Sequence, residues 1–440
     1  MTTPPFEQPL CNLLMSAEYN PAERWSKQLE TIRRLNPKHN AYITVFDKPV
    51  VRKDHRRRAL KGLTVAVKDV FDVRGFPTTA GSKLLAHHIP DDNANAVDIL
   101  LSNGAALNGK TNLHEFAFGV SNINPHYGPC LNPYDTSRVS GGSSGGSAVA
   151  VALGMCDVGL GTDTAGSVRI PASFCGVVGF KPSQGLVSLA GVVPLSWSLD
   201  HIGILSRSVW ENALVFSVLV DGVSRGFSLR AAKLEGVSVG VPANFFLDYL
   251  EKGVRSCFED ALKRLESEGA EIRFVQIEDV EKAVKCRTII GFAESAAYHL
   301  KLCRGRLDLY GEDVRQRIVR GFAIPAVSYV TALRARKKLT ARFRKIFQKV
   351  DVLATPTTII TAHRLDEEEV SVEGKTFTIR AATLRNTEVF NLYGVPAISV
   401  PMGFSATGLP TGLQLIADHG QDKKLLKTAY AVEKLFTTSS

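Results

Sequence analysis

The sequence predicts an α/β protein, because stretches with the pattern of strands alternate along the chain with stretches with the pattern of helices. Residues 63–71 (LTVAVKDVF) are rich in β-branched residues, which is typical of a strand. Residues 93–103 have helical periodicity, and Gly104 follows them where a helix C-cap glycine is expected. The chain has 440 residues, 45% of them hydrophobic, which is enough for a large core.

The same patterns predict further elements. Helices are expected at residues 147–153, 255–269 and 422–436, and the small side chains of the first allow close packing. Short buried strands are expected at residues 237–241, 352–354, 397–400 and 412–417.

These elements suggest how the chain is divided. Residues 1–60 are expected to form an N-terminal helical segment with a loop at Asn36 and Pro37. Residues 275–385 have the least regular pattern, and we expect an insertion there that forms one wall of a cleft. The expected parts are an N-terminal segment at 1–60, a main domain at 61–420 with its core at about 130–200, and a C-terminal helix at 421–440.

The net charge is +10, and two stretches carry much of the excess, residues 52–58 (RKDHRRR) and residues 334–349. The second stretch has eight basic residues and no acidic one, with Leu339, Phe343 and Ile346 along one helical stripe. This pattern favours a solvated helix over a binding surface for nucleic acid.

Cysteine usage and hydropathy exclude several classes of protein. Seven cysteines without a C-x-x-C pair predict neither a disulfide framework nor a structural zinc site. The N-terminus (MTTPPFEQPLCNLLM) does not resemble a secretory leader, and no apolar run reaches the ~18 residues of a membrane span. We therefore expect a cytoplasmic protein with no membrane contact, no metal and no cofactor.

Residues 104–111 (GAALNGKT) match the phosphate-binding pattern G-x-x-x-x-G-K-[ST]. That loop needs a strand before it and a helix after it, so that backbone N–H groups face the phosphates. Here the preceding residues look helical and the apolar interior of the motif looks extended. The sequence therefore favours a helix end at Gly104 followed by a strand.

Residues 141–145 (GGSSG) match the G-x-S-x-G nucleophile elbow of α/β-hydrolases. An elbow needs a strand directly before its serine, whereas here a turn-rich loop (NPYDT) precedes it. It also needs a downstream histidine, but nothing in the sequence marks His201, His299, His363 or His419 for this role. The elbow is therefore disfavoured.

Three segments that contain Lys68, Ser143 and Ser167 together predict nucleophilic chemistry. A serine hydroxyl attacks well only when a base takes its proton, and lysine is a base when burial disfavours its ammonium form. Lys68 lies among the apolar residues of 65–71, and a second serine can relay a proton to a lysine that does not reach the nucleophile. The small residues before Ser167 leave backbone N–H groups that can stabilise an oxyanion.

The same segments resemble the amidase signature family. The Gly/Ser-rich stretch, GTDTAGSVRIPA and FCGVVGFKPS are similar to its signature region, and GLTVAVKDVFDVRGFPTTAGS is similar to its lysine segment. LNGKTNLHEFAFG, DVLATPTT, FNLYGVPAISVP and GLPTGLQLIA extend the similarity over most of residues 60–420. The resemblance implies a single large domain with a central mixed β-sheet flanked by helices.

The resemblance also implies a Ser–cis-Ser–Lys triad. Carried over by position, Ser167 is the nucleophile that is acylated, Ser143 the bridging serine and Lys68 the base. Ser144, directly beside Ser143, is the alternative relay.

The loop around the nucleophile is assigned by the same resemblance. The backbone amides of Thr164, Ala165, Gly166 and Ser167 are expected to form the oxyanion hole. Asp163 and Arg169 are expected to support the loop without reacting. The family more often has glycine at the position of Ala165, and a positive φ there would cost alanine about 1 kcal/mol.

The resemblance implies an amidase that hydrolyses the C–N bond of a small carboxylic amide through a serine acyl-enzyme and releases ammonia or an amine. Alternatives within the family are the glutaminase subunit of a tRNA-dependent amidotransferase and a hydrolase of small urea-derived carboxamides. Residues 121–128 (SNINPHYG) look more like general amidases. A nucleotide- or nucleic-acid-binding protein built on the GKT segment is a hypothesis of another class.

Partners and pocket walls follow from these alternatives. The sequence leaves the oligomeric state open, with a homodimer as one alternative, and a nucleic-acid partner is expected only in the amidotransferase case. The pocket walls are expected from residues 116–121 and from the region 275–385.

Overall fold

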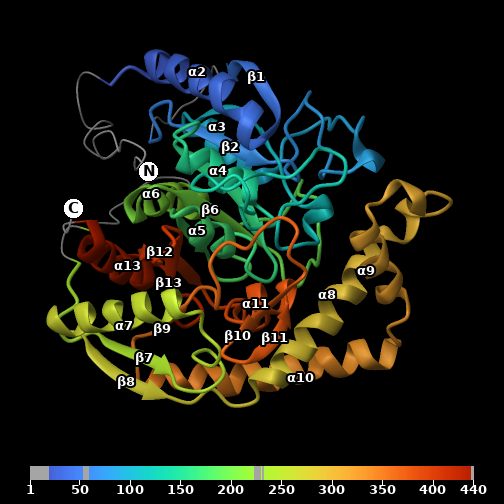
Figure 1. Ribbon diagram of the computed structural model, residues 1–440. Helices are drawn as coiled ribbons and strands as arrows, with labels where there is room; N and C mark the ends of the chain where they lie inside the picture. The colour runs from blue at the N-terminus through green and yellow to red at the C-terminus, as the bar shows by residue number, and fades with distance from the viewer. Residues whose placement is uncertain (1–18, 53–58, 222–228, 230–231, 438–440) are drawn as a thin grey trace.

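The structure is a computed structural model that describes residues 19–52, 59–221, 229 and 232–437. Part of the basic stretch 52–58 and the outer ends of the expected terminal segments lie outside these residues. The described chain folds as a single domain around one 11-stranded sheet that helices flank (Figure 1). The class predicted from the sequence, α/β with a mixed sheet, is confirmed.

The sheet is mixed because parallel strands occur in two groups with antiparallel strands between them. The pairs β3–β2 and β2–β4 are parallel, as are β9–β7 and β7–β8. The pairs that lie between these two groups, β4–β6, β6–β5, β5–β12, β12–β13 and β13–β9, are antiparallel. In sheet order the strands are β1 (Tyr42–Val50), β3 (Ala106–Thr111), β2 (Thr64–Lys68), β4 (Val158–Asp163), β6 (His201–Ser206), β5 (Val178–Lys181), β12 (Ala397–Phe404), β13 (Pro410–Ile416), β9 (Val352–Pro356), β7 (Ser238–Pro242) and β8 (Glu271–Val275).

Helices cover the sheet, and a separate hairpin of β10 (Glu369–Val372) and β11 (Lys375–Thr378) lies beside it. The helices are α2 (Pro21–His39), α3 (Asn95–Ser102), α4 (Gly145–Ala152), α5 (Arg169–Cys175), α6 (Val209–Asp221), α7 (Lys252–Ser267), α8 (Val280–Leu302), α9 (Glu312–Phe322), α10 (Ala326–Arg344), α11 (Ile379–Leu384), α12 (Glu388–Tyr393) and α13 (Asp422–Thr437).

The N-terminal part differs from the expected helical segment. Helix α2 continues through Pro37, so the loop expected at Asn36 and Pro37 is wrong. Pro37 lies in the last turn, and the helix ends where Asn40 adopts a left-handed conformation and donates its N–H to the carbonyl of Asn36. The following residues form β1, which pairs antiparallel with β3 at one edge of the sheet.

A buried carboxylate attaches α2 to the sheet. Asp157 is fully buried and accepts hydrogen bonds from Arg24 (2.7 Å), Gln28 (3.0 Å) and the backbone N–H of Thr64 (2.9 Å). These bonds join α2, β2 and the start of β4, so the strand that ends in Lys68 is fixed from the side of the N-terminal helix.

The helix expected from small residues is α4, and it is buried along most of its length. A side chain at Gly146 would lie 2.4 Å from the carbonyl oxygen of Ala41 and 2.5 Å from that of Asn112. The backbone therefore approaches α4 as closely as glycine permits. This contact positions the Gly/Ser stretch that precedes the helix.

The region 275–385 is mostly helical and is not one insertion, because β9 lies inside the central sheet. Helices α9 and α10 each pack on α8, and the three helices project from one side of the sheet (Figure 1). No single described helix is long and apolar enough to cross a membrane. Helices α9 and α10 reach that length and composition only together, and they are bent by 93° relative to each other.

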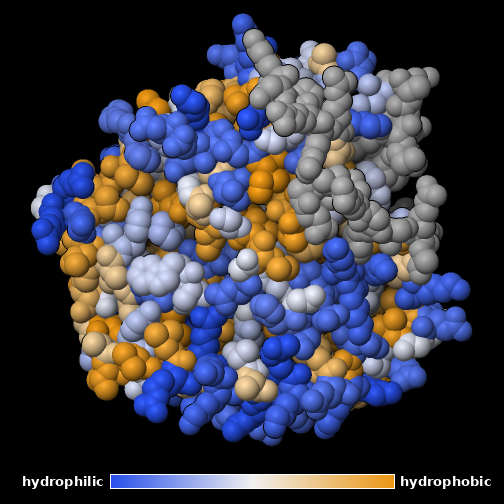
Figure 2. Space-filling model, turned by 180° about the vertical axis from the view of Figure 1, so that it is seen from behind, coloured by the Kyte–Doolittle hydropathy of each residue, from blue (hydrophilic) through white to orange (hydrophobic). Residues whose placement is uncertain are grey.

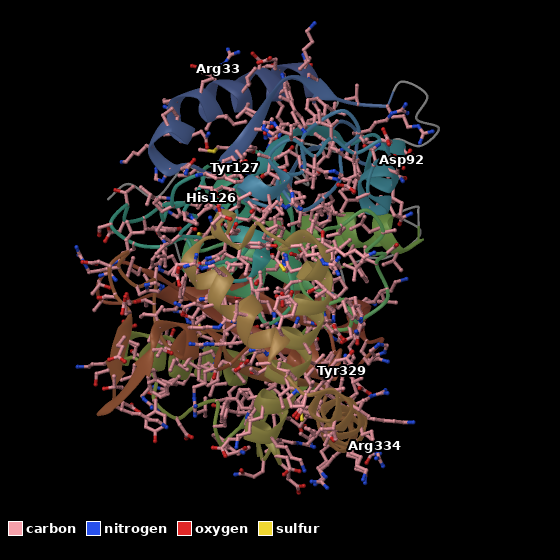
Figure 3. The ribbon with its side chains drawn as sticks, turned by 90° about the vertical axis from the view of Figure 1, so that its right-hand side faces the viewer. Arg33, Asp92, His126, Tyr127, Tyr329 and Arg334 are labelled. Atoms are coloured by element: carbon pink, nitrogen blue, oxygen red, sulfur yellow. The ribbon has the colours of Figure 1, made fainter. Side chains whose placement is uncertain are left out.

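The basic stretch 334–349 lies on α10 and the short 3-10 turn after it, with Leu339 and Phe343 buried. Seven of its eight basic residues are exposed, and hydrophilic side chains cover much of the lower half of the face in Figure 2. Arg334 lies on α10 at the lower end of the view in Figure 3. Arg336 is the inward-facing exception and bonds to the carbonyl oxygens of Leu392 and Ser198. The helix is therefore solvated along its basic faces, as predicted.

Candidate active site

Lys68 is the last residue of β2, which lies between β3 and β4, and its side chain is completely buried. Its Nζ lies 2.7 Å from Ser143 Oγ and 2.8 Å from Thr162 Oγ1. Thr162 is in β4, beside β2, so two neighbouring parallel strands and the loop before α4 converge on one ammonium group.

Burial lowers the pKa of Lys68 to about 7, because the charged form loses its hydration. The carboxylates of Asp200 and Asp163 partly oppose this shift. A lysine with this pKa is neutral in a large fraction of molecules at neutral pH, and a neutral lysine accepts a proton. The burial that the base assignment required is therefore present.

Ser143 and Ser144 have different roles in the structure. The Ser143 hydroxyl contacts Lys68, and the peptide bond between Gly142 and Ser143 is cis. The Ser144 hydroxyl instead bonds to both backbone groups of Thr162, donating to its carbonyl (3.2 Å) and accepting from its N–H (3.3 Å). The alternative that placed Ser144 on the lysine is therefore wrong.

Ser167 lies between Gly166 and α5, and its carbonyl oxygen accepts the N–H of Ser144 at 3.1 Å. This bond brings the two serine-containing segments together. The Ser167 side chain lines a pocket, and its hydroxyl forms no hydrogen bond with any residue that the structure describes. Such a hydroxyl is free to contact a ligand.

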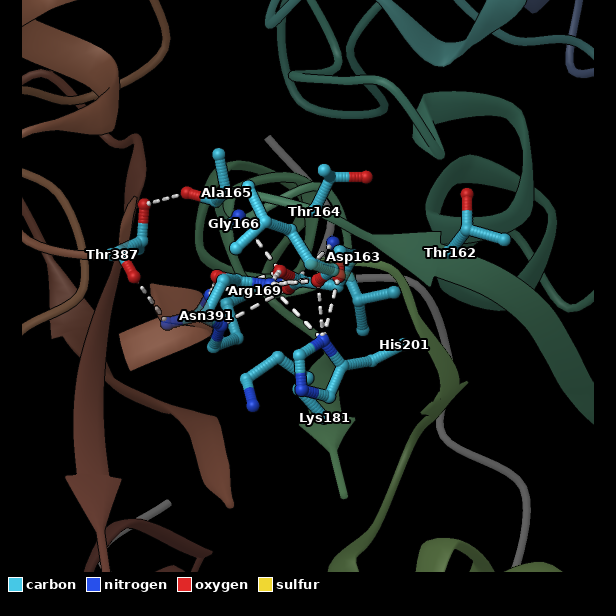
Figure 4. Close-up of polar contacts among 12 residues, drawn as sticks. Thr162, Asp163, Thr164, Ala165, Gly166, Arg169, Lys181, His201, Thr387 and Asn391 are labelled. Atoms are coloured by element: carbon cyan, nitrogen blue, oxygen red, sulfur yellow. Dashed lines mark hydrogen bonds and ion pairs between the residues drawn. The ribbon is translucent and has the colours of Figure 1, made fainter. Parts of the chain in front are cut away.

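Asp163 and Arg169 form a fully buried ion pair beneath this loop (Figure 4). The Asp163 carboxylate accepts from Arg169 Nε (3.0 Å), from the N–H of Gly166 (2.7 Å) and from Asn391 Nδ2 (2.9 Å). Burial alone would raise the pKa of Asp163, but Arg169, Lys181 and Asn391 more than offset it, and the pKa lies well below its usual range. The carboxylate is therefore ionised and holds the loop.

The C-terminal part of the chain completes this support. Arg169 also donates to the carbonyl of Thr387 (3.0 Å) and to Gln414 Oε1 (2.6 Å). The Thr387 hydroxyl donates to the carbonyl of Ala165 at 2.6 Å. The loop before Ser167 is thus fixed by residues that are more than 200 positions away in the sequence.

The four expected oxyanion-hole amides do not all point into the pocket. The N–H of Gly166 is already bonded to Asp163, so it is not available to a substrate and its assignment is wrong. The amides of Thr164, Ala165 and Ser167 form no hydrogen bond within the described part of the chain. Ala165 does not have a positive φ, so alanine costs nothing there, whereas Gly166 has φ +133° and a side chain on it would collide with Thr387.

The pocket beside Ser167 is formed by five parts of the chain. Its walls include both stretches that were expected to line it. The lining residues are Ala117, Phe118, Gly119 and Val120 from one segment, Thr164, Ala165 and Ser167 from the signature loop, Leu195 from the loop before β6, Arg287 and Gly291 from α8, and Arg380 and Leu384 from α11.

The two rival motifs are not sites of the expected kind. Helix α3 precedes the motif 104–111, and the GKT residues themselves lie in β3, so the strand, loop and helix order of a phosphate-binding loop is not present. Lys110 is buried and pairs with Asp69 at 2.6 Å. His201 bonds to the carbonyl oxygens of Leu199 (2.7 Å) and Asp163 (3.2 Å), not to a serine. Among the described residues, no group of three or more His, Cys, Asp or Glu side chains is arranged to hold a metal ion.

The fold is similar to those of solved structures of amidases. A crystal structure of an amidase superposes with a TM-score of 0.88 at 36% identity, covering 97% of this chain and 98% of that one. The A-type subunit of glutamyl-tRNA(Gln) amidotransferase from Thermotoga maritima superposes with a TM-score of 0.82 at 34% identity, covering 97% and 94%.

The chain belongs to the Amidase family, whose model matches residues 25–426. It is 36% identical to the A-type subunit of glutamyl-tRNA(Gln) amidotransferase from Methanosarcina mazei, over 95% of this chain and 94% of that protein. It is 37% identical to the protein of the same name from Koribacter versatilis, over 85% and 84%. The protein is therefore an amidase signature enzyme, as its motifs predicted.

Sequence reasoning missed several residues of the site. Thr162 lies inside the segment GTDTAGSVRIPA, and Asn391 and Gln414 lie inside FNLYGVPAISVP and GLPTGLQLIA. The motifs therefore included these residues, but they did not indicate that Thr162 contacts Lys68 or that Asn391 and Gln414 contact Arg169. Arg287 and Arg380 lie in no motif, and nothing in the sequence indicated that they line the pocket.

We expect Asp163→Asn to destabilise the protein by about 3 kcal/mol or more, because it leaves the Arg169 guanidinium buried with no opposing charge. Urea denaturation followed by circular dichroism measures the change. Asp260→Asn is the matched control, since the same chemical change breaks an exposed pair with Arg264 and should cost at most about 0.5 kcal/mol. Equal effects of the two substitutions would contradict a supporting role for Asp163.

Proposed function

We propose that the protein hydrolyses a carboxylic amide through an acyl-enzyme on Ser167, with Lys68 as the base and Ser143 as the proton relay. The observation that carries the proposal is the buried Lys68, whose pKa of about 7 and 2.7 Å contact with Ser143 Oγ suit proton transfer. The free hydroxyl of Ser167 at the pocket supports the choice of nucleophile.

In the proposed reaction, neutral Lys68 takes the proton of Ser143 as Ser143 takes the proton of Ser167. The Ser167 oxygen attacks the amide carbon, and the carbonyl electrons move to the oxygen. The N–H groups of Thr164, Ala165 and Ser167 stabilise that oxyanion, whereas the N–H of Gly166 is donated to the Asp163 carboxylate. The protonated lysine returns the proton through Ser143 to the leaving nitrogen, and water then hydrolyses the ester by the same relay.

The second candidate is narrower: a glutaminase subunit that passes ammonia to a partner in a tRNA-dependent amidotransferase. The curated relatives support it over a free-standing amidase, because proteins of that name align with up to 97% of this chain. Both candidates use the same proposed serine chemistry, so they differ in substrate and partner.

Replacing Ser167 by alanine should reduce amide hydrolysis at least ~1,000-fold, because the atom that forms the acyl-enzyme is gone. A fluorophosphonate probe followed by peptide mass spectrometry should label Ser167 in the unaltered enzyme. Ser188→Ala, on an exposed loop, is the matched control and should keep both activity and labelling. Labelling at Ser144, or unchanged amide turnover by the Ser167→Ala variant, would contradict the mechanism.

The value of kcat/KM should rise with pH through about 7 and then level off, because only neutral Lys68 accepts a proton and its pKa is lowered to about 7. Initial rates between pH 5 and 9 at constant ionic strength measure the profile. Lys68→Met should be inactive at every pH. Lys83→Met removes an exposed lysine and should leave the profile unchanged. A flat profile would argue against a lysine base.

An ammonia-release screen separates the two candidates. Turnover of simple aliphatic or aromatic amides by the isolated protein is expected for a free-standing amidase. Turnover of glutamine alone, and only when a partner is added, is expected for the amidotransferase component. The test uses purified protein with and without a purified set of partner subunits, and ammonia is measured by a coupled enzymatic assay.

A further inference from the structure

The pocket beside Ser167 carries positive charge and no negative charge on its walls. Of its twelve lining residues, the only charged ones are Arg287 and Arg380, and the others are apolar, small or hydroxyl-bearing. An uncharged amide does not need such a wall, because desolvating a guanidinium is costly without a partner.

Three arginines lie in this region, Arg287, Arg317 and Arg380, and the first two each form an ion pair with a carboxylate. Arg287 forms an ion pair with Glu388, at the start of α12. Arg317 of α9 forms an ion pair with Asp313 at 2.7 Å and also donates to the carbonyl of Phe118. Each of these guanidiniums therefore has one carboxylate.

Arg380 has no such partner. It forms no hydrogen bond or ion pair with any residue in the described ranges, and its guanidinium lies 6.0 Å from the centre of the Phe118 ring. Burial, Arg317 and Arg287 lower its pKa to about 9, so it is still charged at neutral pH. A second donor is also unused, because Nε of Arg287 is buried without a hydrogen-bond partner.

We propose, resting on the hydrolase function above, that the substrate is an amide with a free carboxylate, which Arg380 binds with the unused Nε–H of Arg287. The amide carbon then lies at Ser167. A guanidinium and a carboxylate match in geometry and charge, and the apolar walls strengthen their interaction by excluding water. The substrate class is thus the monoamide of a small dicarboxylic acid or an amide of equivalent charge.

Binding to the full-length Ser167→Ala protein tests this class directly. The probes are the monoamides of malonic, succinic and glutaric acid, each compared by calorimetry with the neutral amide that ends in methyl instead of carboxylate. At least one monoamide should bind about 10-fold or more tightly than its neutral counterpart, as expected for a hydrogen bond between charged groups. Equal binding of every pair would overturn the proposal.

Variants of Arg380 then test whether this residue binds the carboxylate. In the Ser167→Ala background, Arg380→Gln should remove the preference for the carboxylate, and Arg380→Lys should keep part of it because the charge remains but the fork is lost. Arg320→Gln is the matched control, since it removes an exposed arginine of α9 and should keep the full preference. A preference that survives Arg380→Gln would overturn the assignment.

The melting temperature distinguishes a role of Arg380 in binding substrate from a role in folding. Arg380→Gln should change the melting temperature little, since no ion pair is lost and the repulsion from Arg317 and Arg287 is opposed by attraction from Glu388 and Asp313. Arg287→Gln should lower it, because Glu388 loses its buried partner. A large destabilisation by Arg380→Gln would show that its charge serves folding and would overturn the proposal.

The carboxylate site and the hydrolase function fail in different ways. If unaltered enzyme hydrolyses neutral and carboxylate-bearing amides equally well through Ser167, the hydrolase stands and the site is wrong. If the Ser167→Ala protein binds monoamides in an Arg380-dependent manner but unaltered enzyme forms no acyl-enzyme, the site stands and the hydrolase is wrong.

Discussion

The buried ion pair of Asp163 and Arg169 holds the rest of the site in place. One carboxylate joins the end of β4, the loop before Ser167 and helix α12, while one guanidinium reaches Gln414 in β13. A pair of this kind is expensive to bury, and it persists only because nearly every donor and acceptor is satisfied. The free hydroxyl of Ser167 depends on this arrangement, because the same pair fixes the backbone on both sides of it.

The site contains two buried basic side chains, Arg169 and Lys68, whose surroundings differ. Arg169 lies against an ionised carboxylate, whereas Lys68 has only the hydroxyls of Ser143 and Thr162 as direct partners. Desolvation therefore dominates at Lys68 and lowers its pKa. The two side chains therefore differ in their direct partners, and the proposed role of Lys68 as a base rests on this difference.

The pocket is formed by parts of the chain with different constraints. Its signature-loop side is fixed by backbone contacts, and Gly166 there tolerates no side chain. Its other side comes from α8 and α11, which contribute Arg287 and Arg380 to the wall.

The sequence alone determined the α/β class, the main strands and helices, and the positions of Lys68, Ser143 and Ser167, because these depend on local periodicity and on motifs with fixed spacing. It did not determine strand β1, the use of the Gly166 amide by Asp163, or the choice of Ser143 over Ser144 by contact. Tertiary structure alone decided the arginine wall of the pocket. Arg287 and Arg380 are 93 positions apart and more than 100 from Ser167, and no local pattern encodes which side chains meet across such distances.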